Sequence, residues 1–242
     1  MYEGVSAPEP DDPVELLSGS PHMTEQLFGL SFKLVPGAFF QTNTPACEVL
    51  YRTVMGLVNK GDDVTLLDVC CGTGTIGICA AAEGAVKRVI GIELCQRAVD
   101  CAVDNAAANG VGGAVTFTCA RAEHVLRQTL DAHRAQQAAR VAAGADASSA
   151  GTLVAVVDPP RAGLHRSCLE AIRNCSAIMR LVYVSCNPTG SMVADMEALC
   201  GPGSKALSGK PFVPALAVPV DLFPSTDHCE MVIAFDRDTA DC

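Results

Sequence analysis

The chain has 242 residues, 49% of them apolar, no Trp, and a formal net charge of −10 at pH 7. This length is typical of one large α/β domain, and the apolar share is enough for a sizeable aliphatic core. No apolar run is long enough for a membrane span, and the acidic, Pro-rich start is unlike a signal peptide, so we expect no membrane partner. Negative charge repels phosphate, so nucleic acid would need a local basic face.

The 13 cysteines show no C-x-x-C spacing. Neither a zinc site nor a disulfide framework is indicated, and we expect no metal. Several thiols, including Cys79, Cys101 and Cys119, lie in apolar stretches, where Cys behaves as a small hydrophobe. We therefore expect reduced thiols and an intracellular protein of the cytoplasm or nucleus, with the mitochondrion also open.

The N-terminal part of the chain is irregular in pattern. Residues 1–24 predict a linker, or the edge at which the domain was cut from a longer protein, and residues 25–242 predict the folded domain. The segment 27–41 mixes strand patterning with Gly and Pro breaks. A helix is expected next, with Thr44 as its N-cap and Pro45 at the first helical position.

Strands and helices then alternate. The expected strands are 64–70, 88–94, 114–120, 153–160 and 181–188, and the expected helices are 72–82, 96–109, 165–174 and one ending near 199. Residues 128–150 predict a helix followed by a low-complexity loop, together an insertion. Segments 213–223 and 229–236 predict a closing antiparallel hairpin. The order predicts a doubly wound, mostly parallel sheet that binds ligands beyond the carboxyl ends of its strands.

A glycine-rich loop follows the first of these strands. Residues 72–77, GTGTIG, match G-x-G-x-x-G, and Glu93 ends the next strand, where its carboxylate can accept both hydroxyl hydrogens of a ribose. This pattern fits a dinucleotide nearly as well as S-adenosylmethionine. Two features favour S-adenosylmethionine: Asp68, placed to hold its cationic methionyl end, and the D-P-P turn at 158–160, which is typical of methyltransferases.

Two further residues carry candidate chemistry. Cys186, in VSCNP, lies at the carboxyl end of the fifth strand, where a thiol can act as a nucleophile, although a lone Cys is more often a core residue. Glu230 enters the apolar strand MVIAF, where a carboxylate is costly unless it is paired, functional or facing water. The neighbouring His228 is better explained as structural than as a proton carrier.

Five motifs occur in order: FFQTN (39–43), DVCCGTGTIG (68–77), DPPRAG (158–163), VSCNP (184–188) and DLFPSTDHCE (221–230). Together they resemble the RNA uracil-5-methyltransferase family, most of all its eukaryotic tRNA branch. The resemblance implies the class I, Rossmann-like methyltransferase fold and S-adenosyl-L-methionine as cofactor. It also implies methylation of uridine C5 in an RNA substrate, most often the T-loop uridine of tRNA.

The resemblance also implies roles for single residues. It makes Cys186 the nucleophile, which bonds covalently to uridine C6, and Glu230 the base. Candidate RNA contacts are Phe39, by stacking, and Arg161 and Arg166, by phosphate binding. The family has a long N-terminal region that is almost all missing here, and we expect full RNA binding to need it. The candidate cofactor contacts are Gln41, Asp68, Cys70, Gly72, Gly74, Thr75, Glu93 and Asp158.

Other functions fit the residues less well. An amino-group methyltransferase needs no Cys nucleophile and usually has an aromatic residue after D-P-P, where Arg161 stands. An RNA cytosine-C5 enzyme matches fewer motifs, and an NAD-dependent oxidoreductase fits only the glycine loop. An inactive scaffold for RNA binding is disfavoured because both Cys186 and Glu230 are present.

Overall fold

A computed structural model describes residues 15–58, 61–144 and 151–237. In this part of the chain the strands are β1 (Met23–Leu27), β2 (Leu30–Leu34), β3 (Val64–Val69), β4 (Arg88–Glu93), β5 (Val115–Cys119), β6 (Thr152–Val157), β7 (Ile178–Ser185), β8 (Phe212–Val220) and β9 (Glu230–Arg237). The helices are α1 (Thr44–Val58), α2 (Thr75–Ala82), α3 (Gln96–Ala108), α4 (Ala122–Ala142), α5 (Arg166–Asn174) and α6 (Ser191–Cys200). None of the helices in these ranges is long and apolar enough to cross a membrane.

Seven strands form the main sheet, in the order β5-β4-β3-β6-β7-β9-β8. Strands β3 to β7 pair in parallel, whereas β9 runs antiparallel to both β7 and β8. The chain passes from β3 outward through β4 and β5, then returns to the other side of β3 with β6. The order in which the chain adds strands to the sheet therefore reverses between β3 and β6. In open α/β sheets, ligands bind at such a point, beyond the carboxyl ends of the strands. The predicted parallel sheet and closing hairpin are confirmed.

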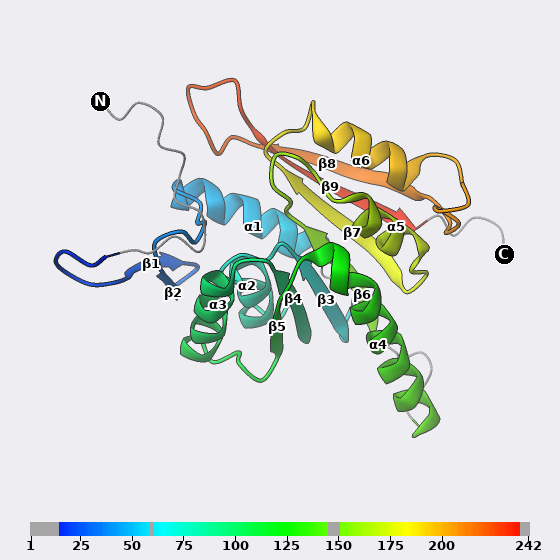
Figure 1. Cartoon of the computed structure of the whole chain (residues 1–242), viewed down its shortest axis with the longest axis horizontal. Helices are drawn as coiled ribbons and strands as arrows, with labels where there is room; N and C mark the ends of the chain where they lie inside the picture. Colours follow the sequence, from blue (N-terminus) through cyan, green and yellow to red (C-terminus); the bar gives the residue numbers. More distant parts are fainter. Residues whose placement is uncertain (1–14, 59–60, 145–150, 238–242) are drawn as a thin grey trace.

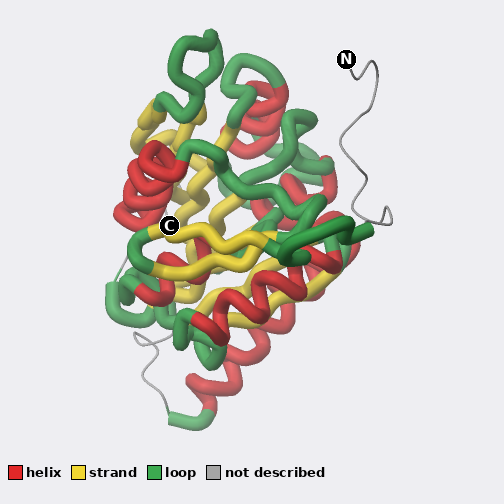
Figure 2. Tube along the Cα trace, turned by 90° about the vertical axis from the view of Figure 1, so that its left-hand side faces the viewer, coloured by secondary structure: helices red, strands yellow, loops and turns green. Residues whose placement is uncertain are grey.

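Helices cover both faces of the sheet (Figures 1 and 2). Helices α1, α2 and α3 pack on one face together with the β1–β2 hairpin, and α4, α5 and α6 pack on the other. The alternation of side chains along β3 produces the two layers, since Leu66 faces the first core and Leu67 the second. Both faces of the central strands are buried, which explains their continuous apolar runs.

Two asparagines, one within α3 and one at its C-cap, hold the small hairpin in place. Asn105 accepts from the Lys33 amide at 2.7 Å and donates to the carbonyls of Lys33 and Thr73 at 3.2 and 3.3 Å. One turn later, Asn109 accepts from the Ser31 amide at 3.0 Å and donates to the Ser31 carbonyl at 2.8 Å. The two side-chain amides thus replace a neighbouring strand along β2. They also tie β2 to the glycine loop at Thr73.

The start of α1 differs from the sequence-based prediction. Thr44 is the first helical residue, and Asn43 caps the helix by accepting from the Ala46 amide at 3.3 Å. Pro45 is therefore at the second position. Asn has a short side chain with an acceptor at its end, which makes it one of the preferred N-caps. Its other end donates to the carbonyl of Leu222 at 3.1 Å, which anchors the segment that precedes β9.

Other boundaries also differ. A two-stranded hairpin of β1 and β2 begins at Met23, before the segment 27–41 and two residues before the expected domain boundary. β8 ends at Val220, three residues earlier than expected. Cys119 is exposed, contrary to its expected apolar setting, and its thiol donates to the carbonyl of Leu94 at 3.3 Å.

Helix α4 starts at Ala122, six residues before the expected insertion, and its C-terminal half projects beyond the sheet (Figure 1). Leu126 and Leu130 lie one helical turn apart and pack on the sheet. This packing stabilises the N-terminal half of the helix, so the helix starts earlier than expected. The expected boundary followed the change in composition toward Ala, Gln and Ser, whereas apolar residues that anchor the helix begin before that change. The final part of the expected insertion, residues 145–150, lies outside the described residues.

Replacing Asn105 by Ala should loosen the hairpin, because three hydrogen bonds are lost at once. We expect the free energy of unfolding to fall by about 2–3 kcal/mol, measured by urea denaturation. Native-state hydrogen exchange should show faster exchange of the Lys33 amide, with the amides of β9 as internal control. Unchanged protection of Lys33 would mean that Asn105 does not hold β2.

Candidate active site

A cavity of about 850 Å³ opens at the carboxyl ends of the central parallel strands. Four of the predicted site residues, Asp68, Gly74, Thr75 and Arg166, do not line it. The nine that line it are Phe39, Gln41, Cys70, Gly72, Glu93, Asp158, Arg161, Cys186 and Glu230. Eight of these come from the five motifs and Glu93 from the end of β4, so the fold gathers most of the predicted site into one hollow.

Parallel strand register places two of the carboxylates. Val69, the last residue of β3, lies opposite Ile92 on β4 and Val157 on β6. The residues that follow are Glu93 and Asp158, so the two carboxylates flank the glycine loop that leaves β3. Their separation in sequence is large, but neighbouring strands lie only about 4.8 Å apart.

Antiparallel register places the proposed nucleophile and base. Ser185, the last residue of β7, lies opposite Met231 on β9. Cys186 follows Ser185 and Glu230 precedes Met231, so continuing the register puts Cys186 opposite Glu230. Side chains opposite each other in an antiparallel pair point to the same face, with Cβ atoms about 5 Å apart. The thiol and the carboxyl therefore share one wall of the cavity.

The glycine loop and Glu93 hold each other. The Gly72 amide donates to one carboxylate oxygen of Glu93 at 2.9 Å, and the Cys95 amide donates to the other at 2.8 Å. Gly72 has φ of 55° and Gly74 has φ of 78°, a backbone region that favours glycine. A Cβ on Gly74 would also lie 2.8 Å from the Phe117 ring. Glu93 is thus oriented by backbone, and Gly74 serves packing beneath the loop.

Asp68 and Thr75 lie below the loop instead of on the cavity wall. The Asp68 carboxylate accepts from the Gly77 amide at 3.2 Å, and its other oxygen has no hydrogen-bond partner among the described residues. Burial raises the pKa of Asp68 to about 7. The Thr75 hydroxyl is hydrogen-bonded to the Tyr51 hydroxyl at 2.9 Å. In this structure both residues support the start of α2.

Two carboxyl groups of the cavity, Glu230 and Asp158, have pKa values above the ordinary range. Glu230 is 3% exposed, and its Oε2 atom has no hydrogen-bond partner in the described part of the chain. Burial raises its pKa to about 7. Burial raises the pKa of Asp158 to about 8, and the charges of Glu230 and Asp68 add to this rise. Such shifts are common where groups exchange protons in catalysis.

Neighbouring groups change the pKa of the Cys186 thiol in opposite directions. Burial raises the pKa of its thiol, and the charges of Glu230 and Asp158 raise it further. The guanidinium of Arg161, which lines the same cavity, lowers the same pKa. The expected role of Arg161 in phosphate binding stays a prediction. Arg166 does not line the cavity, and its Nε donates to Glu170 at 3.0 Å.

The cavity contains residues that the sequence did not single out. Arg121, Glu123, His165 and Cys168 line the side that lies beyond β5 and β6. They stand in the loops and first helical turns after those strands, so the rule about carboxyl ends could have found them. Among the described residues near the base, Asp227 and His228 are exposed and do not line the cavity.

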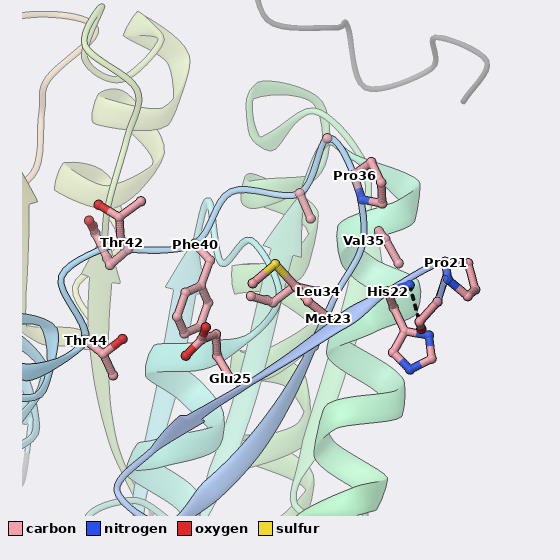
Figure 3. A pocket seen from close by; sticks show the side chains of 14 residues that line it. Pro21, His22, Met23, Glu25, Leu34, Val35, Pro36, Phe40, Thr42 and Thr44 are labelled. Carbon is pink, nitrogen blue, oxygen red and sulfur yellow. Dashed lines mark hydrogen bonds between the residues drawn. The ribbon is translucent and has the colours of Figure 1, made fainter. Parts of the chain in front are cut away.

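A second hollow of about 630 Å³ adjoins this cavity. The side chains of Phe40, Met23 and Leu34 turn into it from the hairpin and the segment that follows it (Figure 3). Residues of the segment 37–42, Gln41 included, line both hollows. This segment is therefore a shared wall, held from below by β2. Within the described residues, no group of three or more His, Cys, Asp or Glu could hold a metal ion.

The sequence model of the family described as tRNA (Uracil-5-)-methyltransferase matches residues 24–237. The chain belongs to this family. Mouse tRNA (uracil-5-)-methyltransferase homolog A is 46% identical over 225 residues, which are 93% of this chain and 34% of that protein. Zebrafish homolog B is 44% identical, over 92% of this chain and 43% of that protein. The chain thus spans about a third to under half of these relatives. The predicted family is confirmed.

A solved structure shows the same fold. The crystal structure of Pyrococcus abyssi tRNA (uracil-54, C5)-methyltransferase, in complex with S-adenosyl-L-homocysteine, superposes with a TM-score of 0.66 and 27% identity. The match covers 90% of this chain and 45% of that one. The predicted class I methyltransferase fold is therefore confirmed.

Glu230 should make stability depend on pH in an unusual direction. Its folded-state pKa of about 7 exceeds the ordinary 4.5, so its stabilising contribution is complete below 4.5 and is lost as pH rises through 7. Glu230→Gln never ionises, so this variant should unfold with a free energy higher than wild type by about 1–3 kcal/mol above about pH 8, and by little near pH 5.

Urea denaturation of both proteins over a pH series measures this difference. The exposed Glu83 offers a matched control, because Glu83→Gln should leave stability the same at every pH. A Glu230→Gln variant no more stable than wild type at alkaline pH would show that Glu230 ionises in the folded protein without cost.

Proposed function

We propose that this chain binds S-adenosylmethionine and methylates C5 of a uridine in RNA, through a covalent bond between Cys186 and uridine C6. The position of Cys186 opposite Glu230, across the β7–β9 pair, carries the proposal. The pair supplies a nucleophile and a base on one wall of a cavity whose other wall contains Glu93 and the glycine loop. Family membership supports the same reaction.

The cavity fits S-adenosylmethionine in shape and charge. At Gly72 a Cβ would meet nothing within 4 Å, so the backbone leaves open space for a ligand beside Glu93. The Glu93 carboxylate, fixed by two amides, keeps acceptor capacity for ribose hydroxyls. Asp158 and Glu230 carry raised pKa values, so a cationic ligand would favour their ionised forms. When bound, the cofactor supplies a methyl group on a positively charged sulfur.

The thiolate of Cys186 activates the uracil ring. Uracil C5 is a weak nucleophile, so the Cys186 sulfur first adds to C6, and the electron pair of the C5–C6 double bond becomes an enolate centred on C5 and O4. C5 then accepts the methyl group. Arg161 stabilises the thiolate before this addition and also when the sulfur leaves.

Glu230 completes the reaction as base. It takes the C5 proton, the electrons of the C5–H bond restore the C5–C6 double bond, and the bond from sulfur to C6 breaks. A base works best when its pKa is near the working pH, and burial brings that of Glu230 to about 7. Because the ionised form is required, turnover should rise as pH increases through this value.

We propose tRNA as the RNA substrate. The mouse and zebrafish relatives are named for tRNA, and the Pyrococcus abyssi enzyme for uracil-54 of tRNA. A T-loop uridine must be rotated out of its stack to reach a cavity of this depth, and the exposed ring of Phe39 at the rim is suited to stacking on it. With a net charge of −10, this chain alone should hold RNA weakly.

The alternative of amino-group methylation has less support. That chemistry requires no thiol, and the residue after D-P-P is Arg161, which lines the cavity with Cys186 where an aromatic stacking partner would be expected. The arrangement therefore favours attack on ring carbon over transfer to an exocyclic amine.

Cofactor binding should depend on Glu93. Isothermal titration should give micromolar affinity for S-adenosylhomocysteine, about −8 kcal/mol, and no heat with NAD. Glu93→Ala removes the ribose acceptor and should weaken binding by about tenfold or more. Glu83→Ala, on the exposed end of α2, is the control and should bind as wild type. Tight NAD binding would contradict the proposed cofactor.

Loss of Glu230 should trap the intermediate. In Glu230→Gln the thiol can still add and the methyl group can still transfer, but the C5 proton stays, so sulfur cannot leave. Incubation with cofactor and ordinary tRNA should give a covalent protein–RNA band on a denaturing gel. Turnover should fall by about 10²–10⁴-fold.

The double variant Cys186→Ala/Glu230→Gln is the control and should give no band. RNA carrying 5-fluorouridine should trap the wild-type protein in the same way. Methylation by Cys186→Ala at a rate near that of wild type would exclude covalent catalysis and revive the amino-group reading.

A further inference from the structure

The loop that carries Arg161 is held by side chains from the segment after the nucleophile. The Arg161 carbonyl accepts from the Ser191 hydroxyl at 2.8 Å and from the Asn187 side-chain amide at 3.2 Å. Asn187 directly follows Cys186, and Ser191 opens α6. One carbonyl oxygen has two lone pairs, and both are used here. The backbone at Arg161 is thus joined directly to the strand end that presents the thiol.

A second connection lies one helical turn further along α6. Asp195 is 5% exposed, and one of its carboxylate oxygens accepts from the Leu164 amide at 2.8 Å and from the Tyr183 hydroxyl at 2.5 Å. Tyr183 belongs to β7, the strand that leads to Cys186. Helix α6 therefore holds both ends of the turn 161–164. Through the hydrogen bond of Asp195 to Tyr183, it also connects this turn to β7.

Two glycines allow this close approach. Gly163 has φ of 82°, and a Cβ on it would lie 2.9 Å from an Asp195 carboxylate oxygen and 3.0 Å from the Ser191 Cβ. A Cβ on Gly190 would overlap the side chain of Asn187. Any larger residue would push α6 away from the turn. The glycines of both loops therefore permit the contacts between the turn 161–164 and α6.

We infer that Ser191 and Asp195 are positioning residues, which fix the Arg161 backbone and so hold its guanidinium in the cavity that Cys186 also lines. The inference rests on the proposed function, in which that sulfur is the nucleophile. Neither Ser191 nor Asp195 lines the cavity, so they act through Arg161. Arginine is long and has many rotamers, and a fixed backbone reduces the entropy lost when it binds the thiolate.

The ionisation of Cys186 provides a direct readout. The charged groups that face this thiol are Arg161, Glu230 and Asp158. Alkylation by iodoacetamide over a pH series, quantified by mass spectrometry of the peptide that contains Cys186, reports the thiolate fraction without RNA or cofactor. Failure of the methylation assay would therefore leave this test intact, and the reverse also holds.

Ser191→Ala should slow alkylation of Cys186 at neutral pH by about threefold to tenfold, the range of one net hydrogen bond. The midpoint should move to higher pH while the alkaline plateau stays the same. Ser191→Thr keeps a hydroxyl and should restore the wild-type profile. Asp195→Asn, which weakens the second connection, should act in the same direction. Ser204→Ala removes a hydroxyl from a distant loop turn and should change nothing.

A double-mutant cycle separates positioning from general structure. In an Arg161→Met background, Ser191→Ala and Asp195→Asn should have no further effect on the alkylation profile, because the guanidinium they position is gone. An equal slowing in both backgrounds would overturn the inference, and so would an unchanged profile with Arg161 present. Thermal melting of each variant identifies any that fails to fold, and the Asp195 and Ser191 variants test the inference independently.

Discussion

The pairing of β9 with β7 is the constraint on which the site depends. In a wholly parallel sheet, the carboxyl ends of all strands lie at one edge and their amino ends lie at the other, and helices connect the strands. Adding one antiparallel strand brings a strand beginning to the same edge, and this puts Glu230 opposite Cys186. Both residues line the same cavity, and the backbone pairing of the two strands up to Ser185 and Met231 brings them there.

This geometry has an electrostatic cost. Glu230 and Asp158 are carboxyl groups in a partly apolar hollow, and burial raises the pKa of each toward neutrality. The same carboxylates disfavour the thiolate of Cys186, and the Arg161 guanidinium opposes them. The charges of the site are therefore balanced between carboxylates and a guanidinium. A positively charged ligand would relieve the repulsion, which suits a sulfonium cofactor.

Glycine has a second role at this site besides forming the cofactor loop. Gly74 and Gly77 let α2 pack closely beneath the loop, with Phe117 and Val89 as the limiting neighbours. Gly163 does the same for α6 beneath the turn of Arg161. In each case a helix start is brought close to a loop that carries functional groups. The rigidity of the site thus comes from close contact between loop backbone and helix, as pre-organised sites require.

The sequence by itself determined the alternation of strands and helices, the family, and the motifs that contain Cys186 and Glu230, because apolar periodicity and motif order are local properties. Tertiary structure alone decided which motif residues meet. It placed Thr75 against Tyr51 beneath the loop, and it placed Arg161 in the cavity that Cys186 lines. These outcomes depend on strand register and on contacts between residues far apart in the chain, which no local pattern encodes.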